Sequence, residues 1–343
     1  MAFEHPPVVC LMGPTASGKT GLACELYDTG RYEIVSVDSA LVYRGMDIGT
    51  AKPTPAELLQ YPHRLIDLIE PEEVYSAANF VTDVTQLITE IRERGKIPLL
   101  VGGTMLYFRS LLSGMAAMPA ANVDVRAQIM QDAEQHGWDW IHQQLAIVDP
   151  RAAQRFLASD RQRVVRALEV YRISGRAISD FHDDQHAEQG THENQATVNG
   201  QFTIYALVPD RALLHQRIEL RLEQMWAAGF LDEVRALRQR PELTAEHPSM
   251  RSVGYRQAWE YLDLLDTETE EQPSANLGSK SAKNPQLTLN SNTNILEKNM
   301  RDRALYATRQ LAKRQYTWIR SLRESHTIQI FNTVNEGFLH LRS

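Results

Sequence analysis

Short apolar runs alternate with segments of helical periodicity over the first third of the chain. The apolar runs predict four strands, at residues 8–12, 33–37, 64–69 and 97–101. Helices are predicted at 19–27 and after Ser76, whose hydroxyl is a typical helix N-cap. Because strands and helices alternate in this way, the pattern predicts an α/β fold with a parallel sheet.

The rest of the chain changes character twice. Helical periodicity dominates residues 123–181, with breaks at Gly137 and Asp149-Pro150, and a polar stretch follows to residue 201. A strand at 202–208 and a long helix at 211–240 then return to the first pattern. Residues 266–298 are rich in polar residues and poor in aromatic ones, which predicts a disordered or loosely packed loop. A helix at 301–323, a strand at 327–331 and a short final helix complete the prediction.

The clearest motif is the run Gly13-Pro14-Thr15-Ala16-Ser17-Gly18-Lys19-Thr20, which lies between the first predicted strand and the first predicted helix. It has the form G-x-x-x-x-G-K-[ST] of a phosphate-binding P-loop. In such a loop, backbone N–H groups at the positive end of a helix dipole cradle a diphosphate. Lys19 adds a full charge, and the Thr20 hydroxyl can bind Mg²⁺. The fold class predicted is therefore α/β, with a P-loop NTPase-like parallel sheet core and a helical insertion domain.

The three predicted parts are residues 1–122 as the first part of the core, 123–201 as the insertion, and 202–343 as the return to the core. A P-loop ATPase or GTPase needs an acidic residue at the end of a later strand. Here the strand at 97–101 is followed by Gly102-Gly103-Thr104, without a carboxylate, and the acid Asp38 follows the strand at 33–37 instead. Since the carboxyl ends of parallel strands meet at one edge, Asp38, Thr15 and Thr104 are predicted to cluster around the bound phosphates.

Composition adds limits on location and metal binding. The 343 residues contain no apolar run of about 18 residues and no signal-like N-terminus, so a cytoplasmic protein is expected. The two cysteines, Cys10 and Cys24, have no metal-ligand spacing and are expected to be packing residues. His182, His186 and His192 fall in the polar stretch and do not predict a metal site.

The formal net charge of −7 disfavours a nucleic-acid partner, but the distribution of charge points the other way. Seven arginines lie between Arg151 and Arg176, against Asp160 and Glu169. A second basic stretch, Arg301 to Arg323, also carries Tyr306, Tyr316 and Trp318. Basic charge beside aromatic rings suits splayed RNA bases, although charge alone equally allows two solvated amphipathic helices.

Five segments in this order resemble those of the bacterial tRNA dimethylallyltransferases (tRNA isopentenyltransferases, the IPP transferase family). They are the P-loop, 38–53, Gly102-Gly103-Thr104-Met105-Leu106-Tyr107, Arg251-Ser252-Val253-Gly254-Tyr255-Arg256-Gln257, and 308–315. The resemblance extends from Val8 to about Trp318. The chain departs from it at Ser252, where relatives often have cysteine, and in a longer polar stretch at 266–298.

The resemblance implies an activity that requires no activated water. A dimethylallyl group would pass from dimethylallyl diphosphate to the exocyclic amine of the adenosine 3′ of the anticodon, in tRNAs that read codons beginning with U. The P-loop, with Mg²⁺ held by Thr20, would stabilise the leaving diphosphate. Arg217 and Arg221, four residues apart on one helix face, would complete a clamp unless they are ordinary surface residues.

The resemblance also implies roles for the remaining site residues. Asp38 would accept the proton of the amine, or would instead bind Mg²⁺ or cap a turn, while Thr15 and Thr104 would hydrogen-bond the diphosphate or its bridging oxygen. The implied tRNA-binding residues are Asp38, Ser39, Ala40, Leu41, Thr104, Arg126, Gln162, Arg163, Val164, Val165, Arg166, Arg251, Ser252, Val253, Gly254, Tyr255, Arg256, Lys313, Arg314, Gln315, Tyr316, Thr317, Trp318, Ile319 and Arg320. The expected partners are a tRNA anticodon stem-loop and dimethylallyl diphosphate, with the enzyme acting as a monomer away from membranes.

Two other classes share the P-loop. A small-molecule or nucleoside kinase would also use Asp38 as a base, and a P-loop ATPase could serve as an RNA-remodelling or regulatory module. A kinase would not need the two basic stretches or the Gly102-Gly103-Thr104 turn, and an ATPase is disfavoured by the missing strand-end acid. Both would consume ATP or GTP, whereas the transferase needs neither.

Overall fold

The computed structural model describes residues 7–191, 202–270 and 285–342. The chain forms two compact units, one made of Met1–Leu112 with Val198–Ser343 and the other of Ser113–Thr197. The domain boundaries expected at 122/123 and 201/202 stay predictions. None of the helices in these described ranges is long and apolar enough to cross a membrane.

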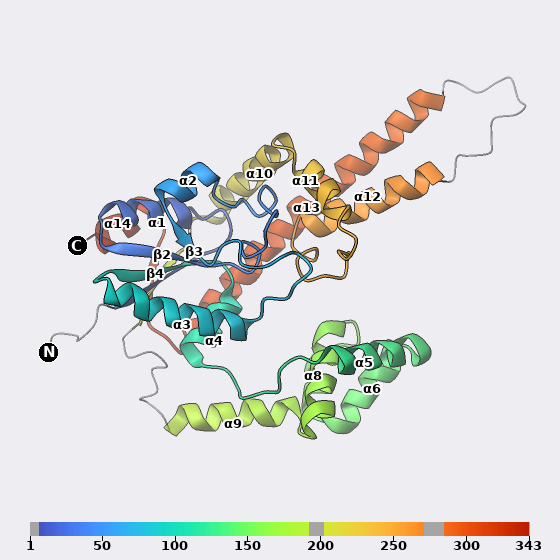
Figure 1. Ribbon diagram of the computed structural model, residues 1–343, viewed down its shortest axis with the longest axis horizontal. Coiled ribbons are helices and arrows are strands. Elements are labelled where there is room, and N and C mark those ends of the chain that lie inside the picture. Colours follow the sequence, from blue (N-terminus) through green and yellow to red (C-terminus); the bar gives the residue numbers. More distant parts are fainter. Residues whose placement is uncertain (1–6, 192–201, 271–284, 343) are drawn as a thin grey trace, which may run out of the picture. The chain divides into compact units, whose positions relative to one another are not determined.

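The first unit is built on a six-stranded parallel sheet with the order β3-β2-β4-β1-β5-β6 (Figure 1). Its strands are β1 (Val8–Met12), β2 (Tyr32–Val37), β3 (His63–Arg64), β4 (Ile97–Gly102), β5 (Phe202–Leu207) and β6 (Ile328–Phe331). All five residues of β1 are buried, as expected for a central strand that is covered on both faces. The predicted α/β class with a parallel sheet is confirmed.

The predicted strand at 64–69 is wrong beyond Arg64. Leu65 and Asp67 adopt φ angles of 63° and 53°, which no strand permits, so β3 ends after two residues. Further along, only an isolated bridge joins Tyr43 to Ile69 among the described residues. The apolar run reflects a buried loop here, because Leu65 is 7% exposed without being in a strand.

Alternate residues of the central strand face two separate cores. Cys10 and Met12 pack with α3 and α4, whereas Val9 and Leu11 pack with α1 and α14. Ser76 caps α3 through the Asn79 N–H, as predicted. The helices of this unit are α1 (Lys19–Asp28), α2 (Pro55–Gln60), α3 (Ala77–Glu93), α4 (Met105–Ser113), α10 (Arg211–Ala227), α11 (Phe230–Arg238), α12 (Tyr255–Glu270), α13 (Pro285–Leu322) and α14 (Val334–Leu341).

Two predictions about the later helices are corrected. The helix predicted at 211–240 is two helices, because Gly229 adopts a φ of 93° and ends α10 before α11 begins. The loop predicted at 266–298 is helical at both ends, since α12 reaches Glu270 and α13 begins at Pro285; residues 271–284 lie outside the described ranges. Helices α12 and α13 lie side by side, and Leu296 packs against the core that Tyr255 and Trp259 join (Figure 1). Tertiary packing therefore outweighs the polar composition there.

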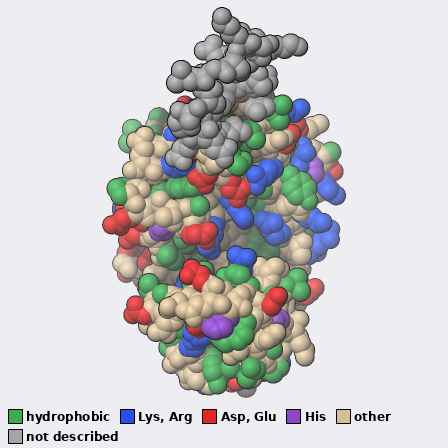
Figure 2. All heavy atoms as spheres, turned by 90° about the vertical axis from the view of Figure 1, so that its right-hand side faces the viewer, with side chains coloured by type: hydrophobic (Ala, Val, Ile, Leu, Met, Phe, Trp, Pro, Cys, Tyr) green, Lys and Arg blue, Asp and Glu red, His purple; other side chains and the backbone are tan. Residues whose placement is uncertain are grey.

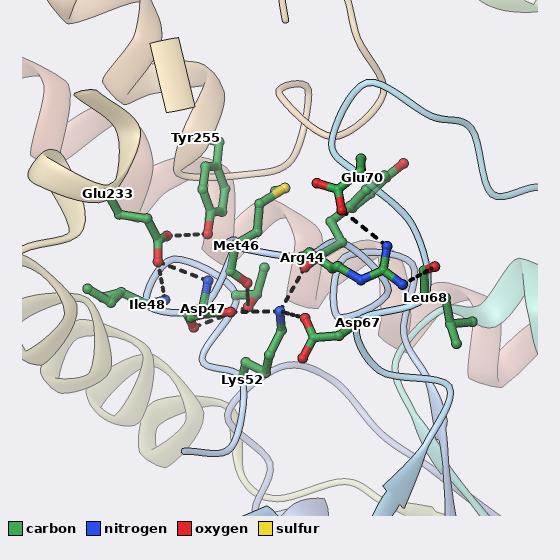
Figure 3. A network of polar contacts seen from close by, with 12 residues as sticks. Arg44, Met46, Asp47, Ile48, Lys52, Asp67, Leu68, Glu70, Glu233 and Tyr255 are labelled. Atoms are coloured by element: carbon green, nitrogen blue, oxygen red, sulfur yellow. Dashed lines mark hydrogen bonds and ion pairs between the residues drawn. The ribbon is translucent and has the colours of Figure 1, made fainter. Parts of the chain in front are cut away.

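The loop from Asp38 to Pro53 is fixed by an acidic side chain from α11 (Figure 3). The Glu233 carboxylate accepts hydrogen bonds from the backbone N–H groups of Asp47, Ile48 and Gly49, at 2.9, 2.7 and 3.2 Å, and from the Tyr255 hydroxyl at 2.5 Å. Lys52, whose side chain is 3% exposed, donates to Asp47 and Asp67. Charge-assisted bonds of this kind hold an irregular segment that has no regular secondary structure to stabilise it.

The second unit consists of helices around one apolar core, as predicted for 123–181. Its helices are α5 (Val123–His136), α6 (Trp138–Val148), α7 (Pro150–Arg155), α8 (Arg161–Ser174) and α9 (Ile178–Thr191). The breaks at Gly137, with a φ of 85°, and at Asp149, which caps α7, are confirmed. The polar stretch that begins at residue 182 does not end the helical part of this unit, because α9 continues through it to Thr191. At the start of α9, Ile178 and Phe181 pack against the core. Residues 192–201 lie outside the described ranges.

A buried carboxylate in α8 organises the polar side of this unit. The Glu169 side chain is 0% exposed and accepts hydrogen bonds from Arg126 at 2.8 Å, from Arg166 at 2.6 Å and from the Asn122 N–H at 2.8 Å. Burial raises the pKa of Glu169, but these donors outweigh burial and hold its pKa below the ordinary value. The ionised carboxylate therefore joins α5 to α8.

We expect Gly49→Ala to destabilise the first unit. An added Cβ would lie 2.1 Å from Phe230 Cε2 and 2.6 Å from Tyr255 Cε2, so two fully buried rings would have to move. Overpacking of this kind costs about 1–3 kcal/mol, measurable as a lower free energy of unfolding in urea. Gly21→Ala is the matched control, because nothing lies within 4 Å of its added Cβ and alanine favours a helix. Equal unfolding free energies for both variants would contradict this account.

We expect Glu169→Gln to lower the free energy of unfolding at pH 7 by about 2 kcal/mol, below the usual cost of breaking a buried pair because both arginines remain partly exposed. A carboxyl group with a lowered pKa stabilises the fold above its unfolded pKa of about 4.3, and this contribution disappears as the pH falls through the lower folded value. The difference between variant and wild type should therefore shrink in acid. Glu134→Gln, at an exposed position of α5, is the control and should leave the free energy of unfolding at pH 7 unchanged.

Candidate active site

The P-loop connects the buried end of β1 to the N-terminus of α1. Gly18, with a φ of 100°, is the N-cap residue of α1 and makes no side-chain cap, so it leaves the first N–H groups of the helix uncapped. At Gly13, an added Cβ would lie 2.6 Å from the Leu207 carbonyl oxygen, which requires glycine where the loop passes β5. Lys19 Nζ donates to the Pro14 carbonyl at 2.9 Å, and thus folds back over the loop. The predicted P-loop geometry is present.

Charged side chains converge on this loop from two other elements. Burial lowers the pKa of Lys19 to about 8, while Asp38 raises it and Arg221 lowers it. Burial also lowers the pKa of Arg221, and Asp38 opposes that shift. These couplings place Lys19, Asp38 and Arg221 within electrostatic reach of one another.

The two predicted clamp arginines contact backbone carbonyls around the loop. Arg217 donates to the Ser17 carbonyl at 3.1 Å, and Arg221 donates to the Thr50 carbonyl at 3.4 Å. Glu219, which lies between them on α10, accepts a hydrogen bond from Arg309 and does not pair with either arginine in this contact. Arg217 and Arg221 therefore face the P-loop and the 38–53 loop.

The ends of β2 and β4 meet as the strand-edge rule predicts. Asp38 follows β2, and its Oδ1 accepts the Ala40 N–H at 2.9 Å, which fixes the start of the loop. Thr104 follows β4, and its Oγ1 accepts the Ser39 N–H at 3.0 Å. Asp38 and Thr104 thus lie on adjacent backbone segments at the carboxyl edge of the sheet.

Gln315 of α13 links this edge to the P-loop. Its Oε1 accepts the Thr15 N–H at 2.9 Å, and its Nε2 donates to the Gly103 carbonyl at 2.9 Å. Hydrogen bonds therefore link the backbone segments that carry Thr15, Thr104 and Asp38. This buried contact was not predicted, since Gln315 was expected to contact RNA.

A magnesium site at this edge would depend on the substrate for most of its ligands. Among the residues that the structure describes, no group of three or more His, Cys, Asp or Glu side chains is arranged to hold a metal. The Thr20 hydroxyl lies on an exposed residue at the start of α1, and Ser17 Oγ is buried there with no hydrogen-bond partner within the same described residues. Mg²⁺ commonly keeps several waters and binds through substrate phosphates, so these residues fit a magnesium diphosphate.

The predicted RNA-contacting residues range from exposed to buried. Arg251, Arg256, Lys313, Arg314, Thr317 and Arg320 are exposed in the first unit, and Gln162 and Arg163 in the second. Figure 2 shows one face of the molecule, on which Lys and Arg side chains gather in patches with Asp and Glu side chains beside them. Val164, Tyr255, Gln315 and Ile319 are 8% exposed or less, so their side chains face the protein core.

Several of the predicted RNA-contacting arginines have protein partners. Arg126 and Arg166 bind Glu169, Arg163 binds Asp160, and Arg256 binds Glu260. Trp318 stacks with Arg109, and the Tyr316 hydroxyl donates to the Pro209 carbonyl. RNA contact by these residues stays a prediction.

Glu233 and Lys52 shape the site and were not among the predicted site residues. Both act on the 38–53 loop from within the protein, and the Thr50 carbonyl in that loop meets Arg221. Lys52 lies inside a segment that the analysis singled out, but no spacing in the sequence pairs it with Asp67. Glu233 is one of 43 acidic residues and carries no motif of its own.

Comparison with known proteins agrees with this geometry. The IPP transferase family model matches residues 41–322, and therefore begins just beyond the P-loop and Asp38. A tRNA dimethylallyltransferase of Acinetobacter baumannii is 50% identical over 338 residues, which cover 98% of each chain. That second match extends the similarity over the P-loop.

Two solved structures are similar to the fold. The tRNA isopentenylpyrophosphate transferase of Bacillus halodurans is 29% identical, with a TM-score of 0.60, over 98% of this chain and 94% of that one. A eukaryotic dimethylallyltransferase crystallised while acting on tRNA shares the fold at 23% identity, with a TM-score of 0.66, over 95% of this chain and 74% of the other. The P-loop is accompanied by an acid after β2, a relative is 50% identical over 98% of each chain, and the family model matches residues 41–322. The chain therefore belongs to the IPP transferase family.

Proposed function

We propose that this protein is a tRNA dimethylallyltransferase, which transfers a dimethylallyl group from dimethylallyl diphosphate to the exocyclic amine of the adenosine 3′ of the anticodon. The observation that carries the proposal is the meeting of the P-loop, Asp38 and Thr104 at one sheet edge. This arrangement supports a diphosphate site beside a carboxylate. The turn after β4 has no acid with which to activate water.

The transfer breaks the bond between the allylic carbon and the diphosphate oxygen, and it forms a bond from that carbon to the adenine nitrogen. Negative charge accumulates on the departing diphosphate, where Lys19, Arg217, Arg221 and the N–H groups of the P-loop stabilise it. Mg²⁺ held through Thr20 would supply further charge neutralisation. Because the leaving group is the diphosphate that the allylic substrate already carries, the transfer requires no ATP.

The adenine amine is a weak nucleophile, since its lone pair is delocalised into the ring. Asp38 accepts the proton that the nitrogen loses as the new bond forms. Its position is fixed by the Ala40 N–H, and Thr104 holds the adjacent Ser39. Thr104 and Thr15 then supply hydroxyl groups toward the diphosphate or its bridging oxygen.

The acceptor base must leave the anticodon loop to reach this edge, as in other enzymes that modify a base. The exposed arginines and lysines at 251–256, 313–320 and 162–166 support the proposal of a tRNA surface. Ser39, Ala40 and Leu41, at the start of the 38–53 loop, would line the base pocket. We further propose preference for tRNAs that read codons beginning with U, action as a monomer, and a cytoplasmic location where tRNA is found.

The first test is transfer of label from allyl-labelled dimethylallyl diphosphate to unmodified tRNA in the presence of Mg²⁺. We expect label on the adenosine 3′ of the anticodon, and at least about a 100-fold lower rate for Asp38→Asn, because a general base contributes 10²–10⁴-fold. Asp139→Asn, at an exposed position of α6, is the matched control and should keep the wild-type rate. Absence of label together with phosphate release from ATP would replace the proposal with a kinase or an ATPase.

A second test concerns the arginine clamp. Arg221→Gln and Arg217→Gln should each lower kcat/KM for dimethylallyl diphosphate by about 10- to 100-fold, which is the range for loss of a hydrogen bond to a charged group. The KM for tRNA should change far less. Arg211→Gln, in the first turn of the same helix, is the control. If all three variants behaved alike, the clamp would be excluded.

A further inference from the structure

The amide of Gln315 joins two segments that are distant from it in sequence. It accepts the Thr15 N–H and donates to the Gly103 carbonyl, both at 2.9 Å, across separations of 300 and 212 residues. The residue is 8% exposed, so its hydrogen bonds are largely shielded from water. Both ends of the amide are therefore used inside the protein.

The contact requires this particular side chain. Thr15 presents a donor and Gly103 presents an acceptor, and a carboxamide offers one of each. Glutamate of the same length would turn a second oxygen toward the Gly103 carbonyl, and methionine of similar size would make neither bond. A buried N–H or carbonyl left without its partner costs about 1–3 kcal/mol.

The turn after β4 is shaped to receive the amide. A Cβ added at Gly103 would lie 2.4 Å from Gln315 Nε2 and 3.3 Å from the Gly13 carbonyl oxygen. Any side chain at position 103 would therefore push the amide away and crowd the P-loop. The second glycine of Gly102-Gly103-Thr104 is explained by this approach.

The two residues that Gln315 bridges belong to the two halves of the proposed chemistry. Thr15 lies in the loop that would hold the diphosphate, and Gly103 precedes Thr104, which contacts Ser39 beside Asp38. We propose that Gln315 is a positioning residue: it sets the separation between the diphosphate-binding loop and the edge that carries Thr104 and Asp38. The inference rests on the proposed transferase function.

This role differs from the RNA contact that sequence analysis assigned to Gln315. On the same helix, Lys313, Arg314 and Arg320 are exposed, whereas Gln315 faces inward. A positioning role predicts that its loss slows the chemical step and weakens use of dimethylallyl diphosphate. An RNA contact predicts instead a higher KM for tRNA alone.

The test is to measure kcat and both KM values for Gln315→Met and Gln315→Glu, together with the Kd for an anticodon stem-loop. We expect kcat to fall by at least about tenfold, because small displacements at a reacting centre cost up to about 100-fold, with the stem-loop Kd unchanged. Lys313→Ala provides the pattern of an RNA contact. Gln329→Glu, at an exposed position of β6, is the matched surface control and should keep wild-type values.

A double-mutant cycle gives an independent check. Gly103→Ala alone should reduce kcat, since its methyl group displaces the amide. Added to Gln315→Ala, the same methyl group meets a smaller side chain and should cost less, so the two effects should not add. Thermal unfolding of each variant, followed by circular dichroism, confirms that the compared proteins are folded.

The outcomes separate this inference from the proposed function. Wild-type protein that transfers no label refutes the transferase. Transfer by wild type, with unchanged kcat in folded Gln315→Met, overturns only the positioning role. A selective rise in the KM for tRNA in that variant, or additive effects in the cycle, would also overturn it.

Discussion

The parallel arrangement of β1, β2 and β4 is the constraint from which the site follows. Parallel strands send their carboxyl ends to one edge, so the segments after Met12, Val37 and Gly102 must meet there. The first segment carries the phosphate-binding loop, the second Asp38 and the third Thr104. If one of these strands were reversed, Asp38 would not lie within electrostatic reach of Lys19, and Thr104 would not bond the Ser39 N–H. The chemistry of the family is therefore a consequence of strand direction as much as of residue type.

Features that a local sequence signal specifies could be predicted from the sequence, and features that depend on distant contacts could not. The P-loop, the cap at Ser76 and the breaks at Gly137 and Asp149 are local signals, and the structure has all of them. The break at Gly229 was missed because a glycine inside an amphipathic pattern is often tolerated. The end of α12 and the start of α13 were predicted as a loop because these two helices pack against each other. Composition does not report pairing between segments.

The site shows the same division. The P-loop is one contiguous motif, and the position of Asp38 at the sheet edge follows from its place after a strand. The inward direction of Gln315 could not be read from a segment that also contains Lys313 and Arg314, since only the position of the helix against the sheet decides which face is buried. Glu233 lies 186 residues from Asp47 along the chain, and their contact has no sequence signature. Charge alone also overstated the exposure of the first basic stretch, because Arg166 is only partly exposed and binds the buried Glu169.

Helix α13 has a consequence for the synthesis of the protein. The strands and loops that carry Lys19, Asp38 and Thr104 leave the ribosome early, but strand β5 comes about 100 residues later and the Gln315 amide later still. Contacts of such long sequence separation form slowly, because a large loop must close before they contribute. A nascent chain that already contains the whole phosphate-binding motif consequently lacks the residue that connects it to the Gly103 turn. Synthesis of most of the chain thus precedes completion of the site, and a chain that ends before α13 lacks the Gln315 link between the P-loop and the Gly103 turn.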